Sequence, residues 1–245
     1  MVKPRWFFSV LLLCAVSKLA QAGPPFVTED PEPAPPGGWE INVPLIIERT
    51  PGKTEMNAPL FDINYGLPNM QLKLEFPIEI VQQDRDATTA GAGDLVLGVK
   101  WRFLNNEQSR FQLGIYPQLL LPTGNHARDL GAGRPAFWLP FVAQKSWDKW
   151  TLYGNAGYWW QTAAETRNYF FAGAVLEREI NDRLTLATEL FGNSPTERGG
   201  RPDFAFSVGG TWKVNDHLNL LFSGGRDIVG DTDAMGYIGL QWLTK

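Results

Sequence analysis

The feature that most constrains this chain is an alternation of apolar and polar residues, which recurs from Trp39 to the C-terminus. Met70–Val81 shows it most clearly, with apolar residues at every even position from 70 to 80 and mostly charged or amide residues between them. Side chains two apart on a β-strand share a face, so the pattern predicts strands with one apolar and one polar face. About ten residues in a tilted strand span a bilayer. The alternation therefore predicts a barrel with lipid outside and a polar interior.

The alternation recurs in about twelve segments, an even number, as expected of a single-chain bacterial barrel. The segments are Trp39–Glu48, Leu60–Leu67, Met70–Val81, Asp94–Phe103, Phe111–Leu121, Pro135–Gln144, Trp150–Gln161, Tyr169–Ile180, Leu184–Phe191, Phe204–Val214, Leu218–Gly224 and Ala234–Trp242. The inward face is left open for residues 135–144 and 169–180, although Phe137, Leu139 and Phe141 favour lipid. We expect an all-β fold, a transmembrane antiparallel up-and-down β-barrel, over residues 39–245.

The connections between these segments alternate between short and long. The long ones are Thr50–Asn57, Gln82–Gly93, Pro122–Arg134, Thr162–Asn168, Asn193–Asp203 and Arg226–Asp233. Outer-membrane barrels have short turns in the periplasm and long loops outside, so both termini are expected in the periplasm. Aromatic residues predict a girdle at each interface, with Tyr169, Phe191 and Tyr237 in the outer one. A soluble β-sandwich is the alternative, but it would not need connections sorted by length.

Residues 1–22 have the pattern of a secretory signal peptide, with Lys3 and Arg5 before an apolar stretch and Ala20-Gln21-Ala22 at the cleavage site. Cys14, the single cysteine, lies inside this leader, so the mature chain would contain none. The formal net charge of −4 falls by three, to −7, when Lys3, Arg5 and Lys18 are removed. An acidic chain has no basic surplus for phosphates, so a nucleic-acid partner is not expected.

Residues 23–38 are rich in proline and acidic residues, which excludes a central strand. Two locations for this segment remain open. It is either a disordered periplasmic tail or a plug folded into the barrel.

Two short motifs carry a family resemblance. They are Gly91-Ala-Gly-Asp-Leu-Val-Leu-Gly-Val-Lys-Trp-Arg-Phe103 and the strand end Leu120-Leu-Pro-Thr-Gly124. With them the chain resembles the outer-membrane β-barrel family named for the meta-pathway of phenol degradation, whose members are described as transporters. The resemblance implies passive uptake of small solutes, aromatic or hydrophobic ones among them. It assigns no catalytic residue and no cofactor.

The polar faces of the predicted strands supply the candidate residues of the lumen. These are Glu40, Asp62, Lys73, Glu75, Glu79, Lys100, Arg102, Gln112, Tyr116, Tyr153, Glu189 and Lys213. A charged ladder of this kind could select solutes by sign. The simpler interpretation is that Lys100 pairs with Glu75 across a hairpin and only neutralises buried charge. About twelve strands leave a narrow bore, so slow or gated passage is expected.

The function that follows is an outer-membrane channel for small solutes, with a non-transporting structural or surface-binding barrel as the alternative. Catalysis at the barrel rim would need a histidine base, and the chain has two histidines, His126 and His217, both in predicted connections. No enzyme, metal or cofactor is therefore expected. The expected partners are outer-membrane lipid, lipopolysaccharide, the barrel-assembly machinery and the solute. The oligomeric state is left open.

Overall fold

The computed structural model describes residues 24–84, 87–163 and 166–244, so the predicted signal peptide lies outside the described residues. The regular secondary structure of the described residues is β-strand, apart from one short 3-10 turn at His126–Arg128. The strands are β1 (Trp39–Thr50), β2 (Lys53–Leu67), β3 (Met70–Gln83), β4 (Thr89–Ala92), β5 (Leu95–Asn106), β6 (Phe111–Ile115), β7 (Gln118–Leu121), β8 (Ala136–Trp147), β9 (Trp150–Gln161), β10 (Tyr169–Asn181), β11 (Leu184–Asn193), β12 (Asp203–Lys213), β13 (Leu218–Val229) and β14 (Ala234–Leu243).

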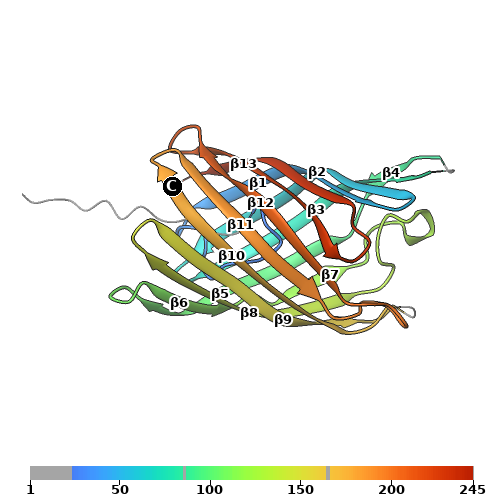
Figure 1. Cartoon of the computed structure of the whole chain (residues 1–245), viewed down its shortest axis with the longest axis horizontal. Coiled ribbons are helices and arrows are strands. Elements are labelled where there is room, and N and C mark those ends of the chain that lie inside the picture. Colours follow the sequence, from blue (N-terminus) through green and yellow to red (C-terminus); the bar gives the residue numbers. More distant parts are fainter. Residues whose placement is uncertain (1–23, 85–86, 164–165, 245) are drawn as a thin grey trace, which may run out of the picture.

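These strands form one closed antiparallel barrel, which Figure 1 shows from the side. Each strand pairs with its sequence neighbours, and β1 pairs with β14, with Val43 opposite Leu240, to close the cylinder. The pairs β4/β5 and β6/β7 are each one barrel strand in two pieces, since both pieces pair with the same neighbour. The second break falls at Tyr116-Pro117, where proline has no N–H for the ladder. The barrel therefore has twelve strands, as predicted.

The outer surface of the barrel is apolar. Many large hydrophobic side chains are exposed, among them Leu45, Phe141, Leu240 and Trp242, and they alternate with buried residues along each strand. A soluble monomer rarely exposes so much contiguous apolar surface, whereas a transmembrane barrel presents it to lipid. Within the part of the chain that the structure describes, no helix is long and apolar enough to cross a membrane.

The structure also fixes the inward faces of the two ambiguous strands. On β8, Phe141 is 65% exposed while Val142 is 0% exposed, so the even positions face the lumen. On β10, Phe170 is 64% exposed and Phe171 is 7% exposed. Alternation could not decide these strands because this part of the lumen wall is itself apolar, so both faces carry large hydrophobic residues.

The two ends of the barrel differ in their connections. At one end, here called the turn end, short turns join the strands and the C-terminus lies (left in Figure 1). The opposite end, the loop end, carries the long connections 122–135 and 194–202. The predicted long loop Thr50–Asn57 is wrong, because β1 and β2 continue to a two-residue turn, Pro51-Gly52, with Gly52 at a φ of 82°. Half of the predicted loop Arg226–Asp233 is likewise strand, since β13 continues to Val229.

Candidate functional site: the occupied lumen

Residues 24–38, here called the lumen segment, lie inside the barrel (Figure 1). Thr28 and Asp30 are 0% exposed, and hydrogen bonds fasten the segment to strands far apart in the sequence. The Thr28 amide donates to Glu189 of β11 at 2.7 Å, and the Ala34 amide donates to Gln71 of β3 at 2.8 Å. The sequence left open whether this segment is a periplasmic tail or a plug, and in the structure it lies inside the barrel.

Composition explains how a non-sheet segment can lie in this space. Its prolines at 24, 25, 31, 33, 35 and 36 have no N–H group, so few backbone donors need partners. Side chains of the wall bind several of the donors that remain, as Asn155 does for the Glu29 amide at 3.1 Å, and Asp30 within the segment binds the Glu32 amide. Gly37 and Gly38 then exchange backbone hydrogen bonds with Gly66 just before β1 begins.

Two glycines of the wall make room for the lumen segment. A Cβ at Gly66 would lie 2.1 Å from the Pro35 carbonyl oxygen, and one at Gly173 would lie 2.0 Å from the Thr28 hydroxyl. Both distances are far below van der Waals contact. The barrel wall therefore fits closely against the lumen segment at two places, beside Pro35 and beside Thr28.

Lys100 is the cation that holds the acidic part of the lumen segment. Its Nζ lies 3.3 Å from the Asp30 carboxylate, 3.5 Å from that of Glu29 and 3.4 Å from the Glu32 carbonyl. It also lies 4.9 Å from the ring centroid of Tyr116. Lys100 itself is 3% exposed, so these contacts are shielded from bulk water.

The predicted Lys100–Glu75 pair is wrong. The register places Gln71 opposite Lys100 and Val96 opposite Glu75, so the two charges lie at different heights on the barrel wall. Glu75 instead pairs with Lys73 on its own strand, at 2.7 Å.

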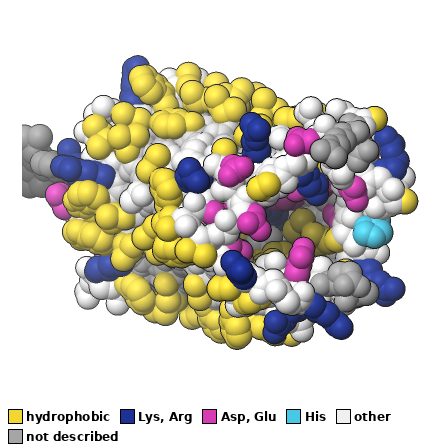
Figure 2. Space-filling model, turned by 45° about the vertical axis from the view of Figure 1, so that its right-hand side comes forward, with side chains coloured by type: hydrophobic (Ala, Val, Ile, Leu, Met, Phe, Trp, Pro, Cys, Tyr) yellow, Lys and Arg dark blue, Asp and Glu magenta, His cyan; other side chains and the backbone are white. Residues whose placement is uncertain are grey.

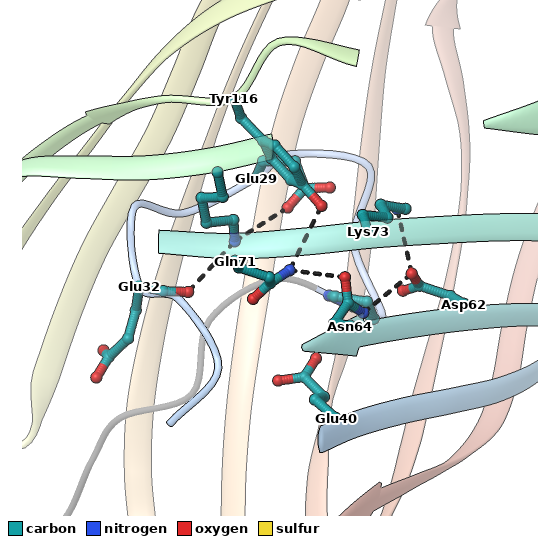
Figure 3. Close-up of a pocket in the computed structure, with 10 residues that line it drawn as sticks. Glu29, Glu32, Glu40, Asp62, Asn64, Gln71, Lys73 and Tyr116 are labelled. Carbon is teal, nitrogen blue, oxygen red and sulfur yellow. Dashed lines mark hydrogen bonds and ion pairs between the residues drawn. The ribbon is translucent and has the colours of Figure 1, made fainter. Parts of the chain in front are cut away.

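A second polar network lines the wall beside the segment (Figure 3). Lys73 also contacts Asp62 at 3.5 Å, and Asp62 accepts hydrogen bonds from Asn42 and Asn64. The Gln71 amide donates to Asn64 at 2.7 Å. Gln71 thus joins this network to the lumen segment. Glu40 and Tyr116 border the same small space, and Glu40 accepts from Asn42 at 3.1 Å.

The remaining candidate residues are spread along the barrel. Glu189 and Tyr153 are 1% exposed in the lumen, whereas Arg102 donates to Gln112 at 3.0 Å nearer the turn end. Glu79 borders Gly93 toward the loop end.

Lys213, by contrast, does not line the lumen as predicted. It is exposed at the end of β12 and pairs with Asp216 at 2.7 Å in the following turn, where its hydrogen bond and charge lower the pKa of Asp216. Lys213 has the inward phase of β12 but is the last residue of that strand, so its side chain reaches the turn at the rim, which alternation alone does not reveal.

Above the lumen segment, toward the loop end, the barrel encloses a cavity of roughly 1110 Å³, here called the vestibule. Pro24–Val27 of the lumen segment line it together with the barrel wall. Trp138, Trp159, Phe171 and Phe191 line the wall as an aromatic cluster. Figure 2 shows the mouth hollowed, with both acidic and basic side chains around the opening and hydrophobic side chains within it.

The sequence did not identify this aromatic wall. Phe191, together with Tyr169 and Tyr237, was predicted to form part of the outer girdle, but Phe191 is 8% exposed and Tyr237 borders the vestibule. Tyr169 stacks on Trp159 at 6.1 Å. Their distance along the strand matched an interface, but their phase is inward. Alternation within the strand could have placed two of them, because Phe191 is two residues from the inward Glu189 on β11 and Tyr237 precedes the lipid-facing Ile238 on β14.

Residues 26–239 match the model of the family described as MetA-pathway of phenol degradation. The chain belongs to this family. Among solved structures, an outer membrane channel from Pseudomonas putida F1 is similar, with a TM-score of 0.75 and 18% identity over 87% of this chain and 98% of that one. The KdgM porin has a TM-score of 0.57 and 10% identity, covering 83% of this chain and 98% of its own. No curated protein sequence matches.

The NanC porin is similar to the same degree, with a TM-score of 0.57 and 10% identity over 82% of this chain and 98% of that one. At such low identity, these likenesses concern the fold. They agree in making this chain an outer-membrane β-barrel of the kind seen in channels and porins.

The two motifs of the family resemblance meet in space at the loop end. Asp94 of the first motif accepts hydrogen bonds from the Gly124 amide at 2.9 Å and from the Ala132 amide at 2.7 Å. Thr123 of the second motif accepts from the Leu95 amide and donates to the Gly93 carbonyl. One carboxylate therefore anchors both ends of the loop 122–135, whose Leu130 is 1% exposed.

Replacing Asp94 by alanine should loosen this loop. Two charge-assisted hydrogen bonds would be lost, with a local cost of about 2 kcal/mol. Hydrogen exchange should accelerate at Gly124 and Ala132, with the barrel strands unchanged. Asp84→Ala, an exposed carboxylate at the same end, is the control and should leave the exchange rates as they are. Equal exchange rates in Asp94→Ala and the unsubstituted chain would contradict this role.

The two histidines take part in loop structure. His126 Nδ1 lies 3.2 Å from the Gly131 carbonyl, and His217 Nδ1 lies 3.0 Å from the Leu243 carbonyl. Among the described residues, no three His, Cys, Asp or Glu side chains are grouped so as to hold a metal ion.

Proposed function

We propose that this protein is an outer-membrane channel for small solutes, in which the lumen segment restricts passage. The observation that carries the proposal is the arrangement along the barrel axis. An open vestibule at the loop end leads to a level where residues 28–34 fill the bore between charged walls. The solved structures with the same fold include channels and porins, which supports a transport role.

The contacts of the lumen segment hold it in one position and also allow it to leave the barrel. Its contacts with the wall are polar or ionic, from Glu189, Asn155, Gln71 and Lys100, and each of these groups can be hydrated when the segment leaves. A purely apolar plug would make departure costly, because its surface would be exposed to water. Polar fastening therefore suits a restriction that opens.

The solutes proposed are small compounds with an aromatic or hydrophobic body. The aromatic wall of the vestibule supports this class, and the family description names phenol degradation. The apolar outer surface of the barrel is proposed to face lipid and lipopolysaccharide after insertion by the barrel-assembly machinery. An exported chain with a cleaved leader is part of the same proposal.

Single-channel recording tests the transport proposal directly. The purified full-length mature protein in planar bilayers should produce discrete, low-conductance steps, and proteoliposomes should admit phenol faster than protein-free liposomes of the same lipid. Heat-denatured protein is the control. The contrary result is a folded barrel that inserts and yet produces no conductance in planar bilayers and no faster solute entry into proteoliposomes. That result would identify a structural or surface-binding protein instead.

A further inference from the structure

We propose that the vestibule is a binding site for organic cations that carry a flat apolar or aromatic body. The first observation is the wall of stacked rings. Trp159 and Trp138 stack with centroids 5.2 Å apart, Trp138 meets Phe171 edge-on at 5.8 Å, and Phe171 stacks on Phe191 at 6.1 Å. Ring faces of this kind attract cations as well as apolar groups.

Small residues on the wall allow these rings to lie together. A Cβ at Gly157 would lie 2.8 Å from the ring of Trp138. Gly173 and Ala205 stand opposite Phe191 on the two neighbouring strands. Trp159 is the more exposed of the two stacked indoles, since Trp138 is 4% exposed and buried against the cluster. Trp159, which also stacks on Tyr169 at 6.1 Å, is therefore the indole of this pair that a solute in the vestibule can reach.

The second observation is the charge of the vestibule. Of the described residues that line it, nine are acidic and two, Lys73 and Arg201, are basic. Lys73 pairs with Asp62 and Glu75, and Glu29 pairs with Lys100, which leaves six acidic residues against Arg201, namely Glu48, Glu189, Glu197, Asp203, Asp227 and Asp231. The exposed Arg198 of the loop 194–202 and the exposed Arg226 of β13 do not line the cavity. A concave site with this surplus concentrates cations and repels anions.

The acidic groups near the mouth accept hydrogen bonds from neutral donors. Asp203 accepts from Asn193 at 3.0 Å, and Asp227 accepts from the Thr232 amide at 2.9 Å. Glu48 accepts from the Thr232 hydroxyl at 3.0 Å. Neutral donors orient a carboxylate without cancelling its charge, so these groups remain available to a cationic solute.

Rings and charges are interleaved along one strand. Glu189, Phe191 and Asn193 follow one another on the inward face of β11, and Asn193 holds Asp203 of β12. Inward residues on a strand are separated by about 7 Å. Glu189 is 1% exposed and already accepts hydrogen bonds from the Thr28 amide and the Ser207 hydroxyl, so Asp203 is the carboxylate that a solute beside the Phe191 ring can reach. A role of this binding site in uptake rests on the proposed channel function, whereas the binding of organic cations to the vestibule does not.

Titration calorimetry on the detergent-solubilised full mature chain tests this inference. Benzyltrimethylammonium should bind saturably, and benzyl alcohol and tetramethylammonium, which lack the charge and the ring respectively, should each bind at least about tenfold more weakly. Benzenesulfonate, the aromatic anion, should not bind. Equal binding of benzenesulfonate and benzyltrimethylammonium would overturn the proposal.

Matched variants locate the site. Trp159→Leu should weaken benzyltrimethylammonium binding about tenfold or more, whereas Trp160→Leu, the next residue but on the lipid face, should leave it unchanged. Asp203→Asn with Asp227→Asn should weaken it similarly, with the turn-end variant Asp216→Asn as control. Equal effects of Trp159→Leu and Trp160→Leu would show that the aromatic wall does not bind the cation. Circular dichroism and heat-modifiable gel mobility establish that each variant is folded.

The calorimetry separates this inference from the proposed channel. Conductance without saturable binding would refute the vestibule site and leave the channel standing. Binding without conductance would refute the channel and leave the vestibule as a surface site for organic cations.

Discussion

Deleting residues 24–36 should raise the single-channel conductance by roughly threefold or more, because the lumen segment fills the bore of a barrel that is narrow to begin with. The deletion leaves Gly37 and Gly38, which bond to Gly66, and all of β1. The barrel wall therefore keeps its complete strand pairing. Planar bilayer recordings of the deletion and the full mature chain, under the same salt and voltage, measure the effect.

A scrambled segment provides the matched control. A variant with the same thirteen residues (24–36) in another order fills the same volume but no longer places Asp30 beside Lys100. We expect it to conduct between the two other forms, with frequent transitions, because it fills the lumen without its fastening. Unchanged conductance in the deletion, in protein whose circular dichroism and heat-modifiable mobility match the full chain, would show that the segment does not restrict flow.

Strand faces could be predicted from the sequence wherever one face meets lipid and the other a polar lumen. Met70–Val81 and Trp150–Gln161 follow this rule, and their inward residues are those that alternation predicts. The rule gives no answer for β8 and β10, because the lumen wall beside the vestibule is aromatic. There both faces are apolar, and only the pairing with neighbouring strands decides the phase.

Pairing partners inside the lumen could not be predicted from the same pattern. Alternation says that Lys100 points inward but not which residue it meets, because the stagger between strands sets the height of each side chain. The location of the lumen segment was open for a related reason. A proline-rich acidic composition suits a tail in water as well as a segment whose few donors are bound by a wall. The inward lysines and the wall glycines Gly66 and Gly173 give no sign in the sequence that they contact the lumen segment. Their role is recognised only when the segment is seen between them.

Replacing Lys100 by methionine should release the lumen segment in the full-length chain. The substitution keeps the length and apolar stem of the side chain, but leaves Asp30 and Glu29 without the cation that lies within 3.5 Å of both. Removing one partner of a buried ion pair costs about 3–5 kcal/mol, and less where water reaches the remaining charge. Water reaches Glu29, whose side chain is 19% exposed, but not Asp30, which is 0% exposed, so hydration relieves only one of the two charges. Even about 3 kcal/mol changes an equilibrium by a factor on the order of 100.

The conductance of Lys100→Met should therefore approach that of the deletion, with longer open times than the unsubstituted protein. Adding Asp30→Asn to Lys100→Met removes a stranded carboxylate and should restore part of the restriction, which a general loss of folding could not do. Lys213→Met is the control, since Lys213 is exposed at the turn end and pairs only with the exposed Asp216 among the described ion pairs. A Lys100→Met channel that conducts like the unsubstituted protein would mean that the hydrogen bonds from Glu189, Asn155 and Gln71 hold the segment without the ion pair.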